Sequence, residues 1–218
     1  MRLQSAIFDM DGTLLDSMFI WDDLGPGMLR DIGITPEEDL SEKLKVLTLR
    51  QGAAYCKERY ALPQSVEEIV SLIEGRVEKF YKEEVQAKPG VAKFLSLLKM
   101  EGVWMYVATA TDRHLAQAAL RHAGIDGYFR GMITCQEVGA GKDSPEIYER
   151  AMRRLQSNKR DTVIFEDALH AIETAKAAGF RVAGVYNPAA EADQAAIQAE
   201  ADYYLRSFEE MFDATDLG

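Results

Sequence analysis

The chain begins with a short apolar run, Leu3 to Phe8, that has the length and composition of a buried β-strand. After Ser17 the apolar positions recur every three or four residues, which is typical of amphipathic helices, and we expect no further strand before Val103. From Val103 onward, short apolar runs alternate with helical patterns. This alternation predicts βαβ units, and therefore a Rossmann-like α/β fold with a parallel sheet and helices on both faces.

The segment 16–85 is predicted to be an inserted helical bundle. Two helix starts carry the residues of a capping box, one from Thr35 to Glu38 with proline at the first helical position, the other from Ser65 to Glu68. An apolar stripe then continues along one long helix through Val66, Ile69, Val70, Ile73, Val77, Phe80 and Tyr81. The other helical segments are Trp21 to Ile32, Leu40 to Val46 and Leu49 to Tyr60.

Residues 1–15 and 86–218 are predicted to form the sheet-containing core. Its expected strands are Leu3 to Phe8, Val103 to Ala108, Gly131 to Cys135, Thr162 to Phe165, and Arg181 to Val185. Its expected helices are Val91 to Met100, a helix capped by Asp112 that carries His122, Ser144 to Leu155, Ala171 to Ala178, a surface helix from Ala189, and a short last helix at Ser207 to Glu210.

Composition narrows the class of protein. The 218 residues include 47% hydrophobic residues, which indicates a globular chain with a sizeable core. A net charge of −11 argues against nucleic acid or an anionic membrane as partner. Cys56 and Cys135 lack metal or disulfide spacing, and no apolar run can span a bilayer. We therefore expect a soluble, unprocessed cytoplasmic protein with packed thiols, a monomer or weak dimer that binds a small molecule.

Polar side chains and turn residues follow four of the expected strands. Strands in open α/β sheets present ligand groups where they end, so these residues are expected to converge. Two acids beside Gly12, which permits backbone angles closed to other residues, suggest a metal ion and an anion. The four groups are Asp9 with Asp11, Thr109, the loop Gly139-Ala140-Gly141-Lys142, and Glu166-Asp167.

The order of these motifs resembles the haloacid dehalogenase (HAD) superfamily, in the branch of small phosphatases and β-phosphoglucomutase-like proteins with a helical cap. The matching residues are Asp9-x-Asp11-Gly12-Thr13-Leu14-x-Asp16-Ser17, Thr109, Gly141-Lys142 with Pro145, and Phe165-Glu166-Asp167 followed by Ala175-x-x-Ala178-Gly179. The resemblance covers the chain from the first strand to the tail, with the cap least specified.

The resemblance implies phosphoryl transfer through an aspartyl-phosphate intermediate, with Asp9 as the nucleophile. Asp11 would protonate the leaving oxygen and later deprotonate the attacking water. It also implies one magnesium ion (Mg²⁺), held by the Asp9 carboxylate, the backbone carbonyl of Asp11 and Asp167, with Glu166 nearby or in the outer shell.

The same resemblance implies a phosphate cradle. Lys142 would contact both the nucleophile and the phosphate, and Thr109 would hold a phosphate oxygen through its hydroxyl. Backbone donors at Ala110 and in Asp11-Gly12 would assist. Departures from the family pattern are Asp143, Ala168 and Ala171, which affect the expected loop geometry but not the core chemistry. His114, His122 and His170 match none of the main motifs, and only His170 lies near one.

The insert would act as a cap whose connections, near Asp16-Ser17 and 84–89, serve as hinges over the site. Arg50 is the candidate cap residue for contact with the leaving group, whereas Phe19 and Trp21 are expected in the bundle core. The leading function is a Mg²⁺-dependent phosphatase of a small phosphorylated metabolite. A phosphosugar mutase is the alternative, and a non-enzymatic phosphate-binding or signalling module is a third; halide removal is disfavoured because dehalogenases of the superfamily lack the second acid.

Overall fold

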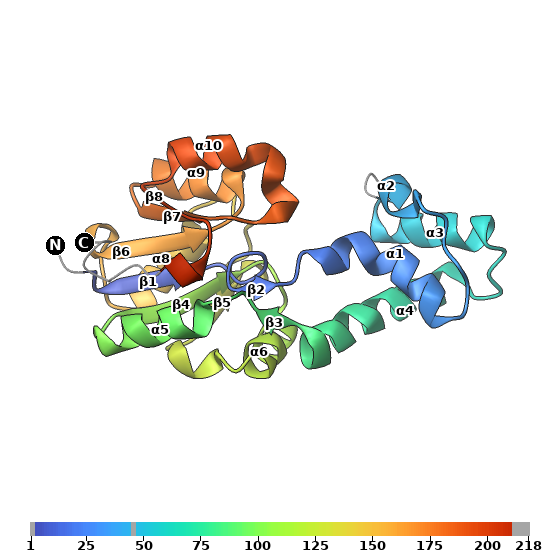
Figure 1. Cartoon of the computed structure of the whole chain (residues 1–218), viewed down its shortest axis with the longest axis horizontal. Helices are drawn as coiled ribbons and strands as arrows, with labels where there is room; N and C mark the ends of the chain where they lie inside the picture. Colours follow the sequence, from blue (N-terminus) through green and yellow to red (C-terminus); the bar gives the residue numbers. More distant parts are fainter. Residues whose placement is uncertain (1–2, 45–46, 211–218) are drawn as a thin grey trace. The chain divides into compact units, whose positions relative to one another are not determined.

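The computed structural model describes residues 3–44 and 47–210. The chain divides into two compact units, coloured along the sequence in Figure 1. Met1–Ser17 and Val85–Gly218 make up the first, here called the core unit, and Met18–Glu84 make up the second, here called the helical unit. Both cysteines are free thiols.

The core unit is built on six strands: β1 (Ser5–Phe8), β4 (Trp104–Thr109), β5 (Met132–Thr134), β6 (Thr162–Glu166), β7 (Arg181–Val185) and β8 (Tyr203–Leu205). All are parallel, in the order β5-β4-β1-β6-β7-β8. The predicted Rossmann-like parallel sheet is confirmed. The prediction missed β8, because three residues in a tail rich in Ala, Glu and Asp carry too little pattern to distinguish a strand.

Helices lie on both faces of this sheet (Figure 1). On one face Ile7 and Ile164 pack in a core with apolar residues of α8 (Glu146–Arg154) and α9 (Leu169–Ala177). On the other, the rings of Phe8 and Phe165 stack with their centroids 4.4 Å apart and contact Phe94 of α5 (Val91–Met100). The helices of the core unit are α5 (Val91–Met100), α6 (Arg113–His122), α7 (Cys135–Val138), α8 (Glu146–Arg154), α9 (Leu169–Ala177) and α10 (Gln194–Glu200).

Two short strands, β2 (Leu15–Asp16) and β3 (Gln86–Ala87), form an antiparallel pair at the two ends of the expected insert. The prediction that no strand follows Ser17 before Val103 is therefore wrong. A two-residue strand has no period to detect, and its pairing joins segments far apart in the sequence. The prediction also missed α7, because a single helical turn is too short to show a period in the sequence. A capping box at Thr134 holds this turn.

The helical unit contains α1 (Phe19–Asp31), α2 (Leu40–Leu44), α3 (Leu49–Arg59) and α4 (Val66–Lys79), followed by a π-helical turn at Phe80–Glu84. Both hydrogen bonds of the predicted capping box at Ser65 are present. The predicted apolar stripe supplies Ile69 and Ile73 to a core with Met28, Leu29, Leu40, Ala53, Cys56 and Leu62. Arg76 of α4 pairs with Asp23 and Asp31 of α1 at 2.6 and 2.7 Å.

Two expectations for the helical unit are wrong, and a third lies outside the described residues. No helix begins at Thr35: the Glu37 amide donates to the Tyr60 hydroxyl at 2.9 Å, and the Glu37 carboxylate contacts Lys43 and Arg59. These tertiary contacts replace the predicted capping box. Phe19 and Trp21 are 57% and 47% exposed, so their placement in the bundle core is wrong. The predicted end of a helix at Val46 lies outside the described residues.

Candidate active site

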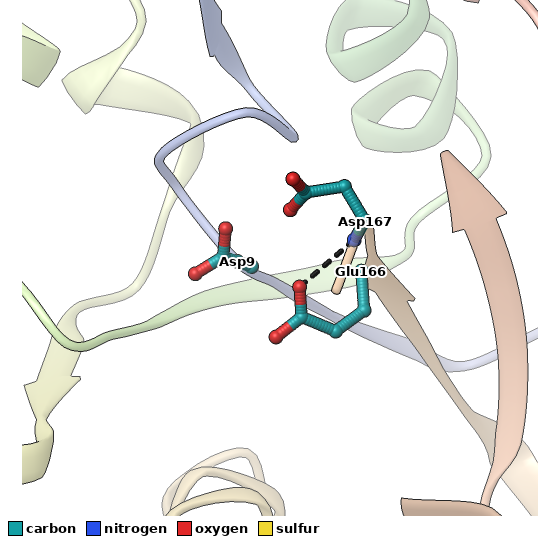
Figure 2. Close-up of side chains that lie close together, drawn as sticks. All are labelled: Asp9, Glu166 and Asp167. Carbon is teal, nitrogen blue, oxygen red and sulfur yellow. Dashed lines mark hydrogen bonds between the residues drawn. The ribbon is translucent and has the colours of Figure 1, made fainter. Parts of the chain in front are cut away.

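Three carboxylates meet at the carboxyl ends of the central strands. Asp9 follows β1, and Glu166 and Asp167 stand at the end of β6, the neighbouring strand. The order of strands reverses between β1 and β6, so these side chains lie at the topological switch point where such sheets bind ligands. The Asp9 amide donates to the Phe165 carbonyl at 2.9 Å, which fixes Asp9 beside Glu166. One carboxylate oxygen from each residue lies within 4.8 Å of the others (Figure 2).

Lys142 provides the positive charge of this cluster. Its Nζ contacts Asp9 Oδ1 and donates to Glu166 Oε1 at 2.6 Å, and its side chain is 8% exposed. The lysine stands in the turn between α7 and α8, as predicted for the loop Gly139-Ala140-Gly141-Lys142. Glu166 is further held by the Tyr148 hydroxyl at 3.1 Å and by the Asp167 amide at 2.8 Å, the bond drawn in Figure 2.

Burial and mutual repulsion perturb the protonation of these groups. Burial raises the pKa of Asp9 well above its usual value, and Glu166 and Asp167 add to the rise despite Lys142. Burial and the neighbouring Glu166 likewise raise the pKa of Asp167 to about 6. Burial opposes the charged form of Lys142, but Asp9 and Glu166 raise its pKa well above the usual range, so the lysine stays charged. With all three carboxyl groups ionised, the cluster would hold more negative charge than its one lysine balances, and this repulsion contributes to the raised pKa values of Asp9 and Asp167.

Asp167 is oriented by two donors. The Thr13 hydroxyl donates to its Oδ1 at 2.8 Å, and the Asn187 amide donates to its Oδ2 at 2.6 Å. Gly12 adopts φ +79°, and a Cβ added there would lie 2.3 Å from Asp167 Oδ2. Only glycine therefore fits both the backbone angle and the space at this turn.

Asp11 lies apart from the three-carboxylate cluster. Its Oδ1 accepts from the Ser17 hydroxyl at 2.7 Å and its Oδ2 from the Thr111 hydroxyl at 2.6 Å. These bonds give the carboxylate a fixed orientation beside the Asp9 turn. Among the described residues, the group suited to a metal ion includes Asp9, Glu166 and Asp167 but not the Asp11 side chain. A ligand from Asp11 through its backbone carbonyl remains a prediction.

Thr109 ends β4, the strand next to β1, and it is fully buried. Its hydroxyl accepts a hydrogen bond from the Thr111 amide at 3.0 Å, whereas the following Ala110 is exposed. These two residues therefore stand at the same sheet edge as Asp9, as predicted from the strand ends. Their contact with phosphate remains a prediction.

The donor set suits a small divalent cation. All three clustered residues offer carboxylate oxygens, the ligands that Mg²⁺ prefers in proteins. Glu166 already accepts from Lys142, Tyr148 and the Asp167 amide. Each Asp167 oxygen accepts one hydrogen bond and Asp9 Oδ1 contacts Lys142, so both residues keep acceptor capacity for an ion. Glu166 is better placed to hold Lys142.

Arg50 and His170 lie elsewhere. Arg50 belongs to α3 in the helical unit, where it is 69% exposed and contacts Glu67 of α4. Its predicted role at the substrate is not tested by this contact. His170 is exposed on α9. In the described parts of the chain, no helix has both the length and the apolar character needed to cross a membrane.

Sequence reasoning did not identify Lys88, Thr111, Tyr148 and Asn187. Asn187 follows the strand Arg181–Val185, so the strand-end rule that found Asp9 could have found it. Thr111 stands two residues after Thr109, at the start of a helix. Lys88 and Tyr148 carry no comparable signal, because the first depends on the β2–β3 pairing and the second on how α8 packs.

Comparison with known proteins gives consistent matches. The family profile for haloacid dehalogenase-like hydrolases matches residues 3–179. A phosphorylated carbohydrates phosphatase of Thermotoga maritima is 29% identical over 184 residues, covering 84% of this chain and 85% of that protein. Hexitol phosphatase B of Escherichia coli K12 is 25% identical over 213 residues, covering 96% and 95%. A Thermotoga maritima crystal structure provisionally assigned as a β-phosphoglucomutase has a TM-score of 0.83 at 28% identity, covering 98% of both chains.

Proposed function

The chain belongs to the haloacid dehalogenase-like hydrolase family, and from that premise we propose that it is a Mg²⁺-dependent phosphatase of a small phosphorylated metabolite. The observation that carries the proposal is the contact of Lys142 with Asp9 inside a cluster of three carboxylates at the switch point of the sheet. Relatives named as phosphatases of phosphorylated carbohydrates and hexitols support the same class of substrate.

In the first half-reaction, a carboxylate oxygen of Asp9 attacks the phosphorus atom of the substrate. The bond from phosphorus to the leaving oxygen breaks, and Asp11 gives its proton to that oxygen. The product alcohol departs and an aspartyl-phosphate remains on Asp9. The hydroxyls of Ser17 and Thr111 hold the Asp11 carboxyl group in place for this transfer.

In the second half-reaction, a water molecule attacks the phosphorus atom of the aspartyl-phosphate. Asp11 takes a proton from the water, the bond from phosphorus to the Asp9 oxygen breaks, and inorganic phosphate leaves. One acid thus serves both steps, first as a proton donor and then as an acceptor. Asp9 and Asp11 both return to their starting states.

Charge neutralisation is the main demand on the rest of the site. The Lys142 ammonium group contacts Asp9 and would also contact the transferred phosphate. Thr109, Ala110 and the backbone of Gly12 would complete the phosphate-binding site. Asp9 and Asp167, with the Asp11 carbonyl, would hold Mg²⁺, and Glu166 would lie next to the ion. When bound, the ion offsets the repulsion between the carboxylates and the phosphate.

Residues 16–85 would serve as a cap that excludes water and contacts the leaving group, with Arg50 as the candidate contact. A phosphosugar mutase is the second candidate, because the aspartyl-phosphate can return its phosphate to a sugar. The structural similarity, at 28% identity, to the protein provisionally assigned as a β-phosphoglucomutase supports the mutase as a second candidate. Access of water to the intermediate separates the two activities.

The test is turnover of p-nitrophenyl phosphate and of a panel of phosphorylated metabolites, with Mg²⁺ and with EDTA. We expect slow Mg²⁺-dependent hydrolysis of the aryl ester, faster hydrolysis of one metabolite, and loss of both in Asp9→Asn. Fluoroberyllate should bind the wild type and not Asp9→Asn. Absence of turnover on the whole panel together with absence of fluoroberyllate binding would overturn the proposal.

A further inference from the structure

Lys88 connects two segments that carry the candidate catalytic groups. It directly follows β3, and its amide donates to the Leu14 carbonyl at 2.9 Å. Its Nζ donates to two further carbonyls, those of Gly12 and Tyr186, each at 2.6 Å. One residue therefore bonds to the turn after β1 and to the segment after β7, which lie far apart in the sequence.

The environment of this ammonium group is unusual for a lysine. Its two Nζ bonds go to neutral carbonyls, and the side chain is partly buried. Burial lowers the pKa of Lys88, while the charges of Asp167, Asp16 and Asp9 oppose that shift. Desolvating an ammonium is costly, and two charge-assisted hydrogen bonds offset only part of it. An uncharged side chain of similar length would fill the space without this cost.

The two carbonyls belong to functional segments. Gly12 directly follows Asp11 and lies so close to Asp167 that no Cβ fits between them. Tyr186 directly precedes Asn187, whose amide orients Asp167. By bonding both carbonyls, Lys88 thus fixes the turn that carries Asp9 and Asp11 relative to Asn187, the donor that orients Asp167.

We propose that Lys88 is a positioning residue of the active site, which braces the Asp9–Gly12 turn against the Tyr186–Asn187 segment and adds a fixed positive charge beside the carboxylates. The role rests on the proposed phosphatase function, because positioning is defined here by its effect on that reaction. Lys88 does not touch the reacting atoms. Its loss changes the rate of the chemical steps more than the binding of substrate.

The test compares Lys88→Met, which removes charge and donors, with Lys88→Gln, which keeps a neutral donor. Lys93→Met is the matched control, because Lys93 lies exposed on α5 and its substitution removes the same charge. Circular dichroism checks folding; if Lys88→Met does not fold, Lys88→Gln decides. The measurements are kcat and KM for p-nitrophenyl phosphate with saturating Mg²⁺, and hydrogen–deuterium exchange of peptides covering residues 9–17 and 184–190.

We expect kcat to fall at least tenfold in Lys88→Met and less in Lys88→Gln, with KM within threefold of wild type. Exchange should accelerate in both peptides and remain unchanged in Lys93→Met. A kcat within threefold of Lys93→Met in the folded Lys88 variants, or unchanged exchange in both peptides, overturns the proposal. A wild type that turns over no substrate of the panel and does not bind fluoroberyllate overturns the phosphatase function instead, and the exchange data still decide whether Lys88 braces the two segments.

Discussion

The hydroxyl of Thr111 donates a hydrogen bond to Asp11 Oδ2 at 2.6 Å across 100 residues of sequence. Thr111 thereby joins the end of β4 to the turn after β1, where Asp9 also lies. This bond and the one from the Ser17 hydroxyl fix the orientation of Asp11, the group proposed to transfer the proton in both half-reactions. The threonine is therefore a sensitive position for the rate of the reaction.

We expect Thr111→Val to lower kcat about fivefold with little change in KM, because one hydrogen bond of roughly 1 kcal/mol to the transferring group is lost. Steady-state kinetics with p-nitrophenyl phosphate measure the effect. Thr174→Val is the control, since the Thr174 hydroxyl donates to the His170 carbonyl within its own helix. Equal kcat values for the two variants would exclude a role for Thr111 in orienting Asp11.

Gly12→Ala should prevent correct assembly of the cluster. The substitution places a methyl group 2.3 Å from Asp167 Oδ2 at a backbone φ of +79°. Gly102→Ala separates the two effects, because Gly102 has φ +80° with no atom within 4 Å of the added Cβ. Both variants lose about 1 to 2 kcal/mol from the left-handed backbone. Gly12→Ala should lose about 2 kcal/mol more in urea unfolding and should lose turnover, which Gly102→Ala keeps.

Lys142→Met should destabilise the protein as well as inactivate it. The variant leaves the buried carboxylates of Asp9 and Glu166 without their cation, which costs about 3 kcal/mol in the free energy of unfolding. Adding Asp9→Asn removes one of those charges, so the double variant should be more stable than Lys142→Met alone. Urea unfolding in EDTA measures both. A double variant no more stable than the single one contradicts this electrostatic explanation.

The stability of the metal-free protein should depend on the pH through Asp167. Its pKa of about 6 in the folded state exceeds the value of about 3.9 in an unfolded chain, so the folded state binds its proton more tightly. The resulting stabilisation is full below pH 4 and is lost as the pH rises to 6. Asp167→Asn lacks this titration, and its stability relative to wild type should therefore rise by on the order of 2 kcal/mol between pH 4.5 and 7.5.

The stabilisation of the protein by Mg²⁺ should increase as the pH rises. Protons compete with Mg²⁺ for Asp167, so the rise in melting temperature produced by Mg²⁺ should be larger at pH 7.5 than at pH 5. Differential scanning fluorimetry measures it, with Asp167→Asn as the control that loses most of the shift. An equal Mg²⁺-induced rise in melting temperature at both pH values would show that Asp167 does not bind the ion.

The sequence was sufficient to place the strand ends that carry Asp9, Thr109 and Glu166. Each ends an apolar run long enough to be recognised, and parallel strands in one sheet bring such ends to one edge. The two glycines that precede Lys142, Gly139 and Gly141, likewise marked a loop. The sheet and these positions followed from local patterns alone.

Other features depend on contacts between distant segments. The helix expected at Thr35 does not form, because Glu37 bonds Tyr60, Lys43 and Arg59 instead of its own helix start. The function of Lys88 as a link depends on the two-residue pairing of β2 with β3, which has no period in the sequence. Such residues can be identified only when the fold brings their partners together.

The pairing of Leu15–Asp16 with Gln86–Ala87 has a consequence for how proteins of this architecture can diversify. The chain leaves the core unit and re-enters it at one antiparallel ladder, so the segment between these points has both of its ends held at one place. Changes in the length, sequence or helix count of that segment need not displace the strands that carry the acids. If the segment selects the substrate, as proposed, selectivity and chemistry are encoded in separable parts of the chain, and one can be exchanged or redesigned while the other is kept.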